Sequence, residues 1–193
     1  MITIGITGGS GSGKSYVSAK MTEMGGKWID ADKLYHELLG KNHAMRNKIL
    51  EAFPEARDGE HINRGKLASM VFTNDKDLMK LNSITHPFVI EAIENEIAEC
   101  YCVNDEFVII DAIALFESGL SNICDVTIGV IADENLRIDR IVERDDLSVP
   151  RARTRVRAQQ KEDYYRRKCD YIIENNGETD VDGQIRNIIS KVL

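Results

Sequence analysis

Residues 8–15 form the segment GGSGSGKS, whose residue types and spacing are typical of a phosphate-binding loop. Glycine and serine leave backbone N–H groups open to phosphate oxygens, and glycine adopts backbone angles that larger residues avoid. In this pattern Lys14 reaches the β- and γ-phosphates of a nucleotide, and the Ser15 hydroxyl is placed to bind Mg²⁺. The alternative is a flexible linker, which does not explain the apolar run 2–7 before the segment or the helical pattern after it. The residues predicted to surround the phosphates are Gly8, Gly9, Gly11, Ser12, Gly13, Lys14 and Ser15.

Two aspartates follow predicted strands and are candidates for the chemistry of phosphate transfer. Asp32 comes shortly after a strand predicted at 27–30, where a carboxylate can accept the proton of an attacking hydroxyl. An aspartate there can equally cap the next helix, and position alone leaves both interpretations open. Asp111 ends the apolar strand 107–111, where an acid supports Mg²⁺ directly or through water. The alternative for Asp111 is a strand-end carboxylate that accepts hydrogen bonds from loop amides.

Basic residues are concentrated between residues 137 and 168, which hold eleven of them against six acidic residues. The whole chain has a formal net charge of −7, so this basic segment contrasts with an acidic remainder. A mobile arginine-rich helical pair over the phosphates would stabilise the transition state and exclude water. A solvated helical face is the alternative interpretation for most of these arginines.

Composition and charge exclude several classes of protein. The 193 residues can form one well-buried domain with a smaller additional part. The negative net charge argues against a general nucleic-acid binder. No apolar stretch approaches the roughly 20 residues that span a membrane, and we expect no secretory signal. The four cysteines form no C-x-x-C pair, so we expect free thiols in a reducing cytoplasm, without a zinc site or disulfides.

The hydrophobic pattern predicts strands that alternate with helices. Fully apolar strands are typical of a parallel sheet covered on both faces, so the predicted fold class is α/β with a three-layer P-loop core. The predicted strands are 2–7, 27–30, 107–111, 125–131 and 171–175. The predicted helices around them are 16–24, 32–39, 134–144, 150–168 and 181–193. Gly40 is expected to stop the second of these helices, and Ser148 and Pro150 to begin the fourth.

The segment 43–102 lacks strong strands and is predicted to be a helical insertion. Its turn signals lie near Pro54, at Asp58-Gly59 and at His86-Pro87, and Pro87 is expected to end or kink a helix. We therefore expect three parts in the chain. They are a nucleotide-binding core of 1–42, 103–136 and 169–193, a helical substrate-binding insertion of 43–102 and a helical lid of 137–168.

Further motifs follow the loop in a fixed order along nearly the whole chain. They are ITGGSGSGKS at 6–15, WIDAD at 28–32 with His36-Glu37, Arg64, Leu67, Val71 and Phe72 in an R-x-x-L-x-x-x-V-F pattern, His86-Pro87, Leu115-Phe116-Glu117, Arg140, Arg144 and Ser148, Arg155 with Gln159, and IENNG at 173–177. The phosphate loop alone is shared by many unrelated enzymes, but the combination is far more specific. The chain resembles the bacterial dephospho-CoA kinase family.

This resemblance implies the last step of coenzyme A synthesis, in which the γ-phosphate of ATP moves to the ribose 3′-hydroxyl of dephospho-CoA. Matching positions assign catalysis to Asp32 as the base, Lys14 and Arg140. They assign ATP binding to Gly11 through Tyr16, Arg140 and Asn175. They assign the acceptor side to Arg64, His86 and Leu115, and dephospho-CoA binding to the helical insertion. We expect Mg²⁺ as cofactor, ATP and dephospho-CoA as partners, no nucleic acid, no membrane, and a monomer or a weak homo-oligomer.

The chain departs from the family pattern at a few positions. Tyr16 replaces a usual threonine, and Ser10 replaces a common isoleucine. Ile113-Ala114 replaces a proline and a leucine, which changes the expected shape of the acceptor side. Two rival functions remain, a kinase for a nucleoside or nucleotide and a nucleotide-dependent switch, although a switch needs no enclosed acceptor pocket.

Overall fold

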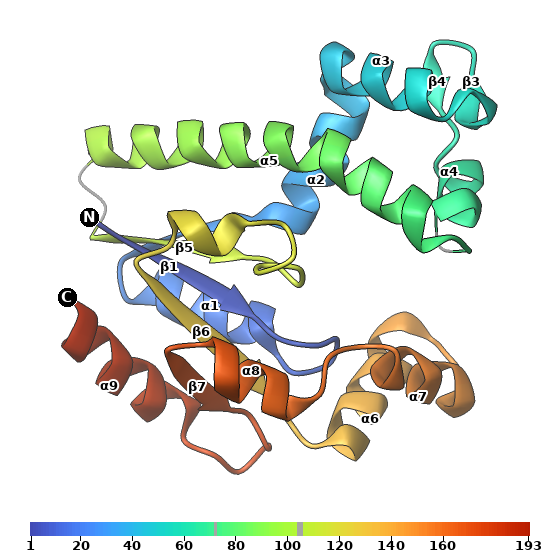
Figure 1. Cartoon of the computed structure of the whole chain (residues 1–193). Coiled ribbons are helices and arrows are strands. Elements are labelled where there is room, and N and C mark those ends of the chain that lie inside the picture. Colours follow the sequence, from blue (N-terminus) through green and yellow to red (C-terminus); the bar gives the residue numbers. More distant parts are fainter. Residues whose placement is uncertain (72, 104–105) are drawn as a thin grey trace. The chain divides into compact units, whose positions relative to one another are not determined.

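A computed structural model describes residues 1–71, 73–103 and 106–193 of the chain (Figure 1). The described residues form two compact units, one of residues 1–30 with 100–193 and one of residues 31–99. The sequence predicts an insertion at 43–102, whereas the second unit begins at Ala31. The reason is the helix α2 (Ala31–Lys41), which buries Leu39 in the apolar cluster of that unit. Phe72, part of one family pattern, lies outside the described residues.

A parallel sheet of five strands forms the centre of the larger unit, in the order β2-β5-β1-β6-β7. The strands are β1 (Ile2–Thr7), β2 (Gly26–Asp30), β5 (Phe107–Asp111), β6 (Val126–Ile131) and β7 (Tyr171–Glu174). The register places Asp111 beside Ile6 on one side and Asp30 on the other, where three strands reach their carboxyl ends. Ligands of open α/β sheets bind beyond this edge, so the sheet brings the phosphate loop and Asp111 to one place.

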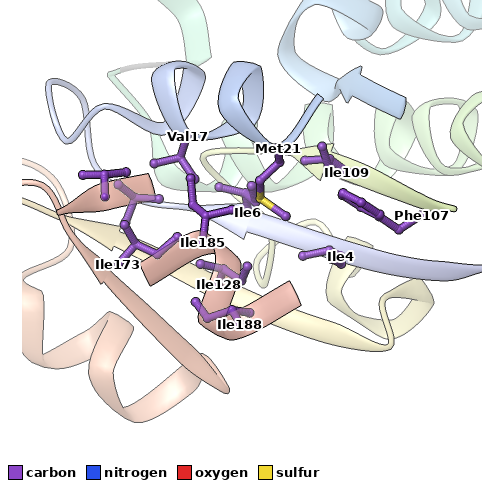
Figure 2. Close-up of a cluster of buried hydrophobic side chains, with 12 residues drawn as sticks. Ile4, Ile6, Val17, Met21, Phe107, Ile109, Ile128, Ile173, Ile185 and Ile188 are labelled. Atoms are coloured by element: carbon purple, nitrogen blue, oxygen red, sulfur yellow. The ribbon is translucent and has the colours of Figure 1, made fainter. Parts of the chain in front are cut away.

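Helices cover both faces of this sheet, which confirms the three-layer α/β prediction. α1 (Lys14–Glu23) and α9 (Val181–Val192) pack on one face, and Figure 2 shows their side chains among those of the strands. On β6, Ile128 and Val130 belong to this cluster, whereas Gly129 lies against Tyr165 on the other face. The cluster consists of Ile4, Ile6, Val17, Met21, Phe107, Ile109, Ile128, Val130, Ile173, Val181, Ile185 and Ile188.

The predicted helix 150–168 is two helices. α6 (Glu134–Asp145) is followed by α7 (Val149–Arg157) and α8 (Glu162–Lys168), so the prediction of one helix is wrong between residues 158 and 161. Pro150 lies in the first turn of α7 as predicted, and Ser148 holds the N-cap position without a side-chain hydrogen bond to the helix. Residues 158–161 contain no glycine or proline, so their own propensity does not explain the break. A contact of Gln159 with the phosphate loop, described below, explains it.

The smaller unit is mainly helical. It contains α2, α3 (His43–Ala52), the short 3₁₀ helix η1 (Pro54–Ala56), the strands β3 (Arg57–Asp58) and β4 (His61–Ile62), α4 (Arg64–Val71) and most of α5 (Asp75–Val103). The predicted turn at Asp58-Gly59 is confirmed, and Gly59 takes a φ of 59° between the two short strands. Gly40 does not stop α2; Asn42 caps α3 instead, accepting a hydrogen bond from Met45 N at 2.9 Å. The buried cluster of this unit consists of Leu39, Met45, Ile49, Phe53, Ala56, Leu67, Val71 and Leu81.

The helix α5 continues through Pro87 instead of ending there. Of the two outcomes expected at Pro87, an end or a kink of the helix, the end is wrong, and Figure 1 shows one continuous helix that bends along its length. Apolar positions such as Leu81, Val89 and Ile93 are buried on both sides of the proline, so tertiary packing maintains the helix. Within residues 1–71, 73–103 and 106–193, no helix combines the length and apolar character needed to cross a membrane.

The last strand of the sheet, β7, has part of its outer side covered by a glutamine. The Gln184 side chain on α9 accepts a hydrogen bond from Glu174 N at 2.9 Å and donates one to Glu174 O at 3.0 Å. Asn175 N donates in the opposite direction, to Ile131 O on β6, at 2.9 Å. The carboxylate of Glu174 also forms an ion pair with Arg166 on α8, whose Nη2 lies 2.5 Å from Oε1.

Candidate active site

The phosphate loop connects the central strand β1 to the start of α1. Gly13 is the N-cap of α1 and has a φ of 94°, which favours glycine. At Gly8 a Cβ atom would collide with the carbonyl oxygen of Val130 on the neighbouring strand. The loop closes on itself through Ser12 N and Gly9 O at 3.1 Å. The first N–H groups of α1 and the positive end of its dipole therefore begin directly at the loop, as an anion site requires.

Lys14 forms an ion pair with Asp111, the residue that ends β5. The Lys14 Nζ atom lies 2.9 Å from Asp111 Oδ1, and their side chains are 12% and 3% exposed. Ser18 Oγ donates a hydrogen bond to the other oxygen of Asp111 at 3.2 Å. Side chains from α1 therefore hold this carboxylate, in place of the loop amides that the alternative interpretation required. The pair places a cation at the start of α1 with its counter-charge already beside it.

Arg137 and Gln159 brace the phosphate loop through Ser10. Ser10 N donates to Gln159 Oε1 at 2.8 Å, and Gln159 Nε2 donates to Ser10 Oγ at 2.8 Å. Arg137 Nε donates to Ser10 O at 3.0 Å, and its Nη2 donates to Gln159 Oε1 at 2.9 Å. Burial lowers the pKa of Arg137, although that of a guanidinium starts so high that it stays charged. We call this arrangement of Ser10, Arg137 and Gln159 the loop brace.

Arg140 and Asn175 contact the other end of the loop. Arg140 Nη1 donates to Gly11 O at 3.1 Å, and Nη2 donates to Asn175 O at 3.1 Å. The buried Asn175 in turn donates from Nδ2 to Ser12 O at 2.9 Å. The resemblance implies that Arg140 contacts phosphates, whereas the structure places its guanidinium on backbone carbonyls of the loop. Sequence reasoning missed the loop brace, although Arg137 and Arg140 lie three residues apart, on one face of α6.

A cleft of about 570 Å³ opens beside the end of the loop. Its volume is in the range of small-molecule sites. It brings together residues predicted for ATP binding, Gly13, Tyr16, Arg140 and Asn175, with the start of α9. The remaining lining residues are Gly177, Thr179, Asp180, Val181 and Asp182.

The oxygen donors at the loop fit a magnesium ion bound together with phosphates. Ser15 is an exposed hydroxyl in the first turn of α1, and Asp111 is a carboxylate next to Lys14. Hydroxyl and carboxylate oxygens are ligands that Mg²⁺ prefers, and this ion usually takes its other ligands from phosphates and water. Across the described part of the chain, no group of three or more His, Cys, Asp or Glu side chains could hold a metal by itself.

The other predicted residues lie in different surroundings. Asp32 is the second residue of α2, so it is not the helix cap that one interpretation proposed. Arg64 donates from Nη2 to His36 O at 3.3 Å, and burial lowers the pKa of the half-buried His86. Leu115, which the resemblance assigns to the acceptor side, is fully buried in the larger unit and packs beside Gly5. Its side chain supports the core and presents no surface to an acceptor.

We expect the loop brace to order the phosphate loop. Replacing Gln159 with leucine removes its hydrogen bonds to Ser10 and Arg137, so the free energy of unfolding should fall by about 1–3 kcal/mol. The KM for ATP should rise, because the loop must then be ordered on binding. Chemical denaturation and steady-state kinetics measure the two effects.

The neighbouring Gln160 provides the control, because it has the same chemistry and is exposed. Gln160→Leu should change stability by no more than about 0.5 kcal/mol and leave the KM unchanged. Equal effects of the two substitutions would show that the brace does not order the loop.

Comparisons with known proteins agree on one family. The family model described as dephospho-CoA kinase matches residues 2–180. The dephospho-CoA kinase of Fusobacterium nucleatum is 37% identical over 179 residues, covering 91% of this chain and 90% of that protein. The dephospho-CoA kinase of Saccharomyces cerevisiae is 32% identical over 204 residues, covering 100% of this chain and 83% of that protein.

Solved structures share the fold, and one of them is named as a dephospho-CoA kinase. A structure from Thermus thermophilus has a TM-score of 0.83 at 30% identity and covers 100% of this chain and 98% of its own. The dephospho-CoA kinase of Campylobacter jejuni has a TM-score of 0.68 at 27% identity, covering 98% and 96% of the two chains. A shikimate kinase from Acinetobacter baumannii, with a TM-score of 0.59 at 14% identity over 100% and 93% of the chains, shares the fold alone.

Proposed function

Because this chain belongs to the dephospho-CoA kinase family and is a kinase, we propose that its phosphate loop and Asp32 carry out phosphoryl transfer from ATP to dephospho-CoA. The reaction moves the γ-phosphate to the ribose 3′-hydroxyl and yields coenzyme A and ADP. The observation that carries the proposal is the loop between β1 and α1, with Lys14 and Asp111 paired at 2.9 Å beside it. A cytoplasmic location and a monomeric or weakly associated state belong to the same proposal.

The larger unit binds ATP by its phosphates. The N–H groups at the start of α1 and the helix dipole attract the β- and γ-phosphates. Lys14 contacts the same oxygens and stabilises the charge that spreads over the migrating phosphoryl group. The guanidinium of Arg140 keeps the loop carbonyls turned toward itself, and this leaves the opposite N–H groups for the phosphates. Arg140 therefore positions the loop in this proposal.

Ser15 and Asp111 would hold Mg²⁺, Asp111 directly or through water. When bound, this ion neutralises charge on the phosphate oxygens. Asp111 has Lys14 as its ion-pair partner and Ser18 as a hydrogen-bond donor, so its carboxylate is fixed in place beside the loop. The exposed Ser15 hydroxyl is accessible at the first turn of α1.

The smaller unit, residues 31–99, receives dephospho-CoA in this proposal. Asp32 accepts the proton of the ribose 3′-hydroxyl as that oxygen attacks the γ-phosphorus atom. Arg64 and His86 belong to the same unit and contribute to the acceptor side. Closure of the arginine-rich segment 137–168 excludes water, which prevents hydrolysis of ATP.

A coupled assay of ADP release tests this function. The wild-type chain is incubated with ATP and Mg²⁺, with and without dephospho-CoA, and the product mass is measured. We expect ADP release that depends on dephospho-CoA and a product heavier by one phosphoryl group. Release with a nucleoside or nucleotide acceptor instead would indicate a different small-molecule kinase. Slow ADP release at a rate that does not depend on any acceptor would indicate a nucleotide-dependent switch.

A further inference from the structure

Tyr16 is an aromatic side chain that lies exposed immediately after the phosphate loop. It is the third residue of α1, directly after Lys14 and Ser15, and 49% of its surface is exposed. Sites that bind small molecules are lined mainly by apolar and aromatic side chains. Tyr16 belongs to the wall of the cleft of about 570 Å³, together with Gly13 and Asn175.

The ring of Tyr16 has a cation over one of its faces. Lys20, one helical turn further along α1, places its Nζ atom 6.0 Å from the ring centroid. The same ammonium forms an ion pair with Glu23 at 3.2 Å. Because Lys20 lies over one face of the ring, a planar ligand would stack on the opposite face.

The position of the cleft relative to the loop indicates which part of a ligand it takes. A nucleotide whose β- and γ-phosphates lie on the N–H groups at the start of α1 must direct its nucleoside away from the loop. The cleft begins at Gly13, the last loop residue before α1, and extends to the start of α9 at Val181. Its volume of about 570 Å³ accommodates a nucleoside.

We propose that the Tyr16 ring packs against the nucleoside of the bound nucleotide and sets its affinity. The proposal rests on the proposed function, since it assumes that the loop binds ATP. A threonine at this position would contribute no aromatic face, so Tyr16→Thr removes the proposed contact. Loss of an aromatic side chain that stacks on a base weakens binding by about 5–150-fold, and such stacking tolerates different bases, since every base has a π-face.

Calorimetric titration of the full chain with two ligands separates the nucleoside from the phosphates. ADP carries both parts, whereas tripolyphosphate carries phosphates alone. Tyr16→Thr should weaken ADP binding by about 5–20-fold, the lower part of the stacking range, and leave tripolyphosphate binding unchanged. Tyr16→Phe should bind both ligands as the wild type does, because the ring remains.

Three results would overturn the proposal. They are an unchanged ADP affinity in Tyr16→Thr, equal losses for ADP and tripolyphosphate, and a loss in Tyr16→Phe as large as in Tyr16→Thr. Thermal unfolding of each variant verifies that it is folded, which we expect because Tyr16 is half exposed. Neither titration requires dephospho-CoA, so failure here is distinguishable from failure of the proposed acceptor, which the ADP-release assay measures.

Discussion

Asp32→Asn is expected to lower turnover by about 10²–10⁴-fold, the usual contribution of a general base. Asparagine has nearly the same shape as aspartate but cannot accept the proton of the ribose 3′-hydroxyl. Asp32 is not part of the phosphate loop, so the affinity for ADP should stay within about twofold of the wild type. ADP release with saturating ATP and dephospho-CoA measures turnover, and calorimetry measures the affinity for ADP.

A substitution of the same chemistry elsewhere in the smaller unit serves as the control. Asp58 is exposed on the short strand β3, and Asp58→Asn should retain wild-type turnover. If Asp32→Asn transferred phosphate at nearly the wild-type rate, Asp32 would not be the base. A loss of ADP binding together with turnover would assign Asp32 a role in nucleotide binding.

Lys14→Gln is expected to lower transfer by about 10²–10³-fold, the typical cost of removing one donor to a transition-state oxygen. It should also destabilise the fold, because Asp111 is 3% exposed and loses the cation 2.9 Å away. Breaking a buried ion pair at one partner costs about 3–5 kcal/mol, and the partial exposure of Lys14 makes this an upper limit. ADP release and chemical denaturation measure the two losses separately.

A double substitution separates the structural part of this effect from the catalytic part. Lys14→Gln combined with Asp111→Asn leaves two neutral side chains that can share a hydrogen bond, so most of the lost stability should return. Transfer should stay low, because neither the cation nor the carboxylate is restored. Recovery of transfer in the double variant would mean that Lys14 serves only to neutralise Asp111.

The strands and the phosphate loop could be predicted because their signals are local. β5 consists of four apolar residues followed by Asp111, and both ends of the strand were predictable from that run. The loop needs small residues at the positions where phosphate approaches the backbone, and the sequence 8–15 supplies them. The same locality explains the turn at Asp58-Gly59.

The features that could not be predicted depend on contacts between residues that are distant in the sequence. Ser10 and Gln159 are 149 positions apart, and no local signal shows that Gln159 leaves the helical pattern to contact the loop. A leucine at position 115, shortly after β5, could line a pocket or belong to the core. Because Gly5 has no side chain, it leaves space beside it that the buried Leu115 side chain occupies. The proline in α5 is accommodated because apolar residues on both sides of it are buried.

Gln184 of α9, which covers part of the outer side of β7, determines whether another strand can pair with this edge of the sheet. A strand of another chain extends a sheet by pairing with a row of outward N–H and C=O groups, and such edges are sites of aggregation. Asn175 N donates to Ile131 O on β6, so the backbone N–H and C=O groups of Ile172 and Glu174, which alternate with it, point away from β6. The side chain of Gln184 already forms hydrogen bonds with both groups of Glu174. Of the four residues described for β7, Ile172 alone then offers outward groups beyond the reach of Gln184. One residue is too short a template for a foreign strand, so this edge is protected against intermolecular sheet growth without a covering domain.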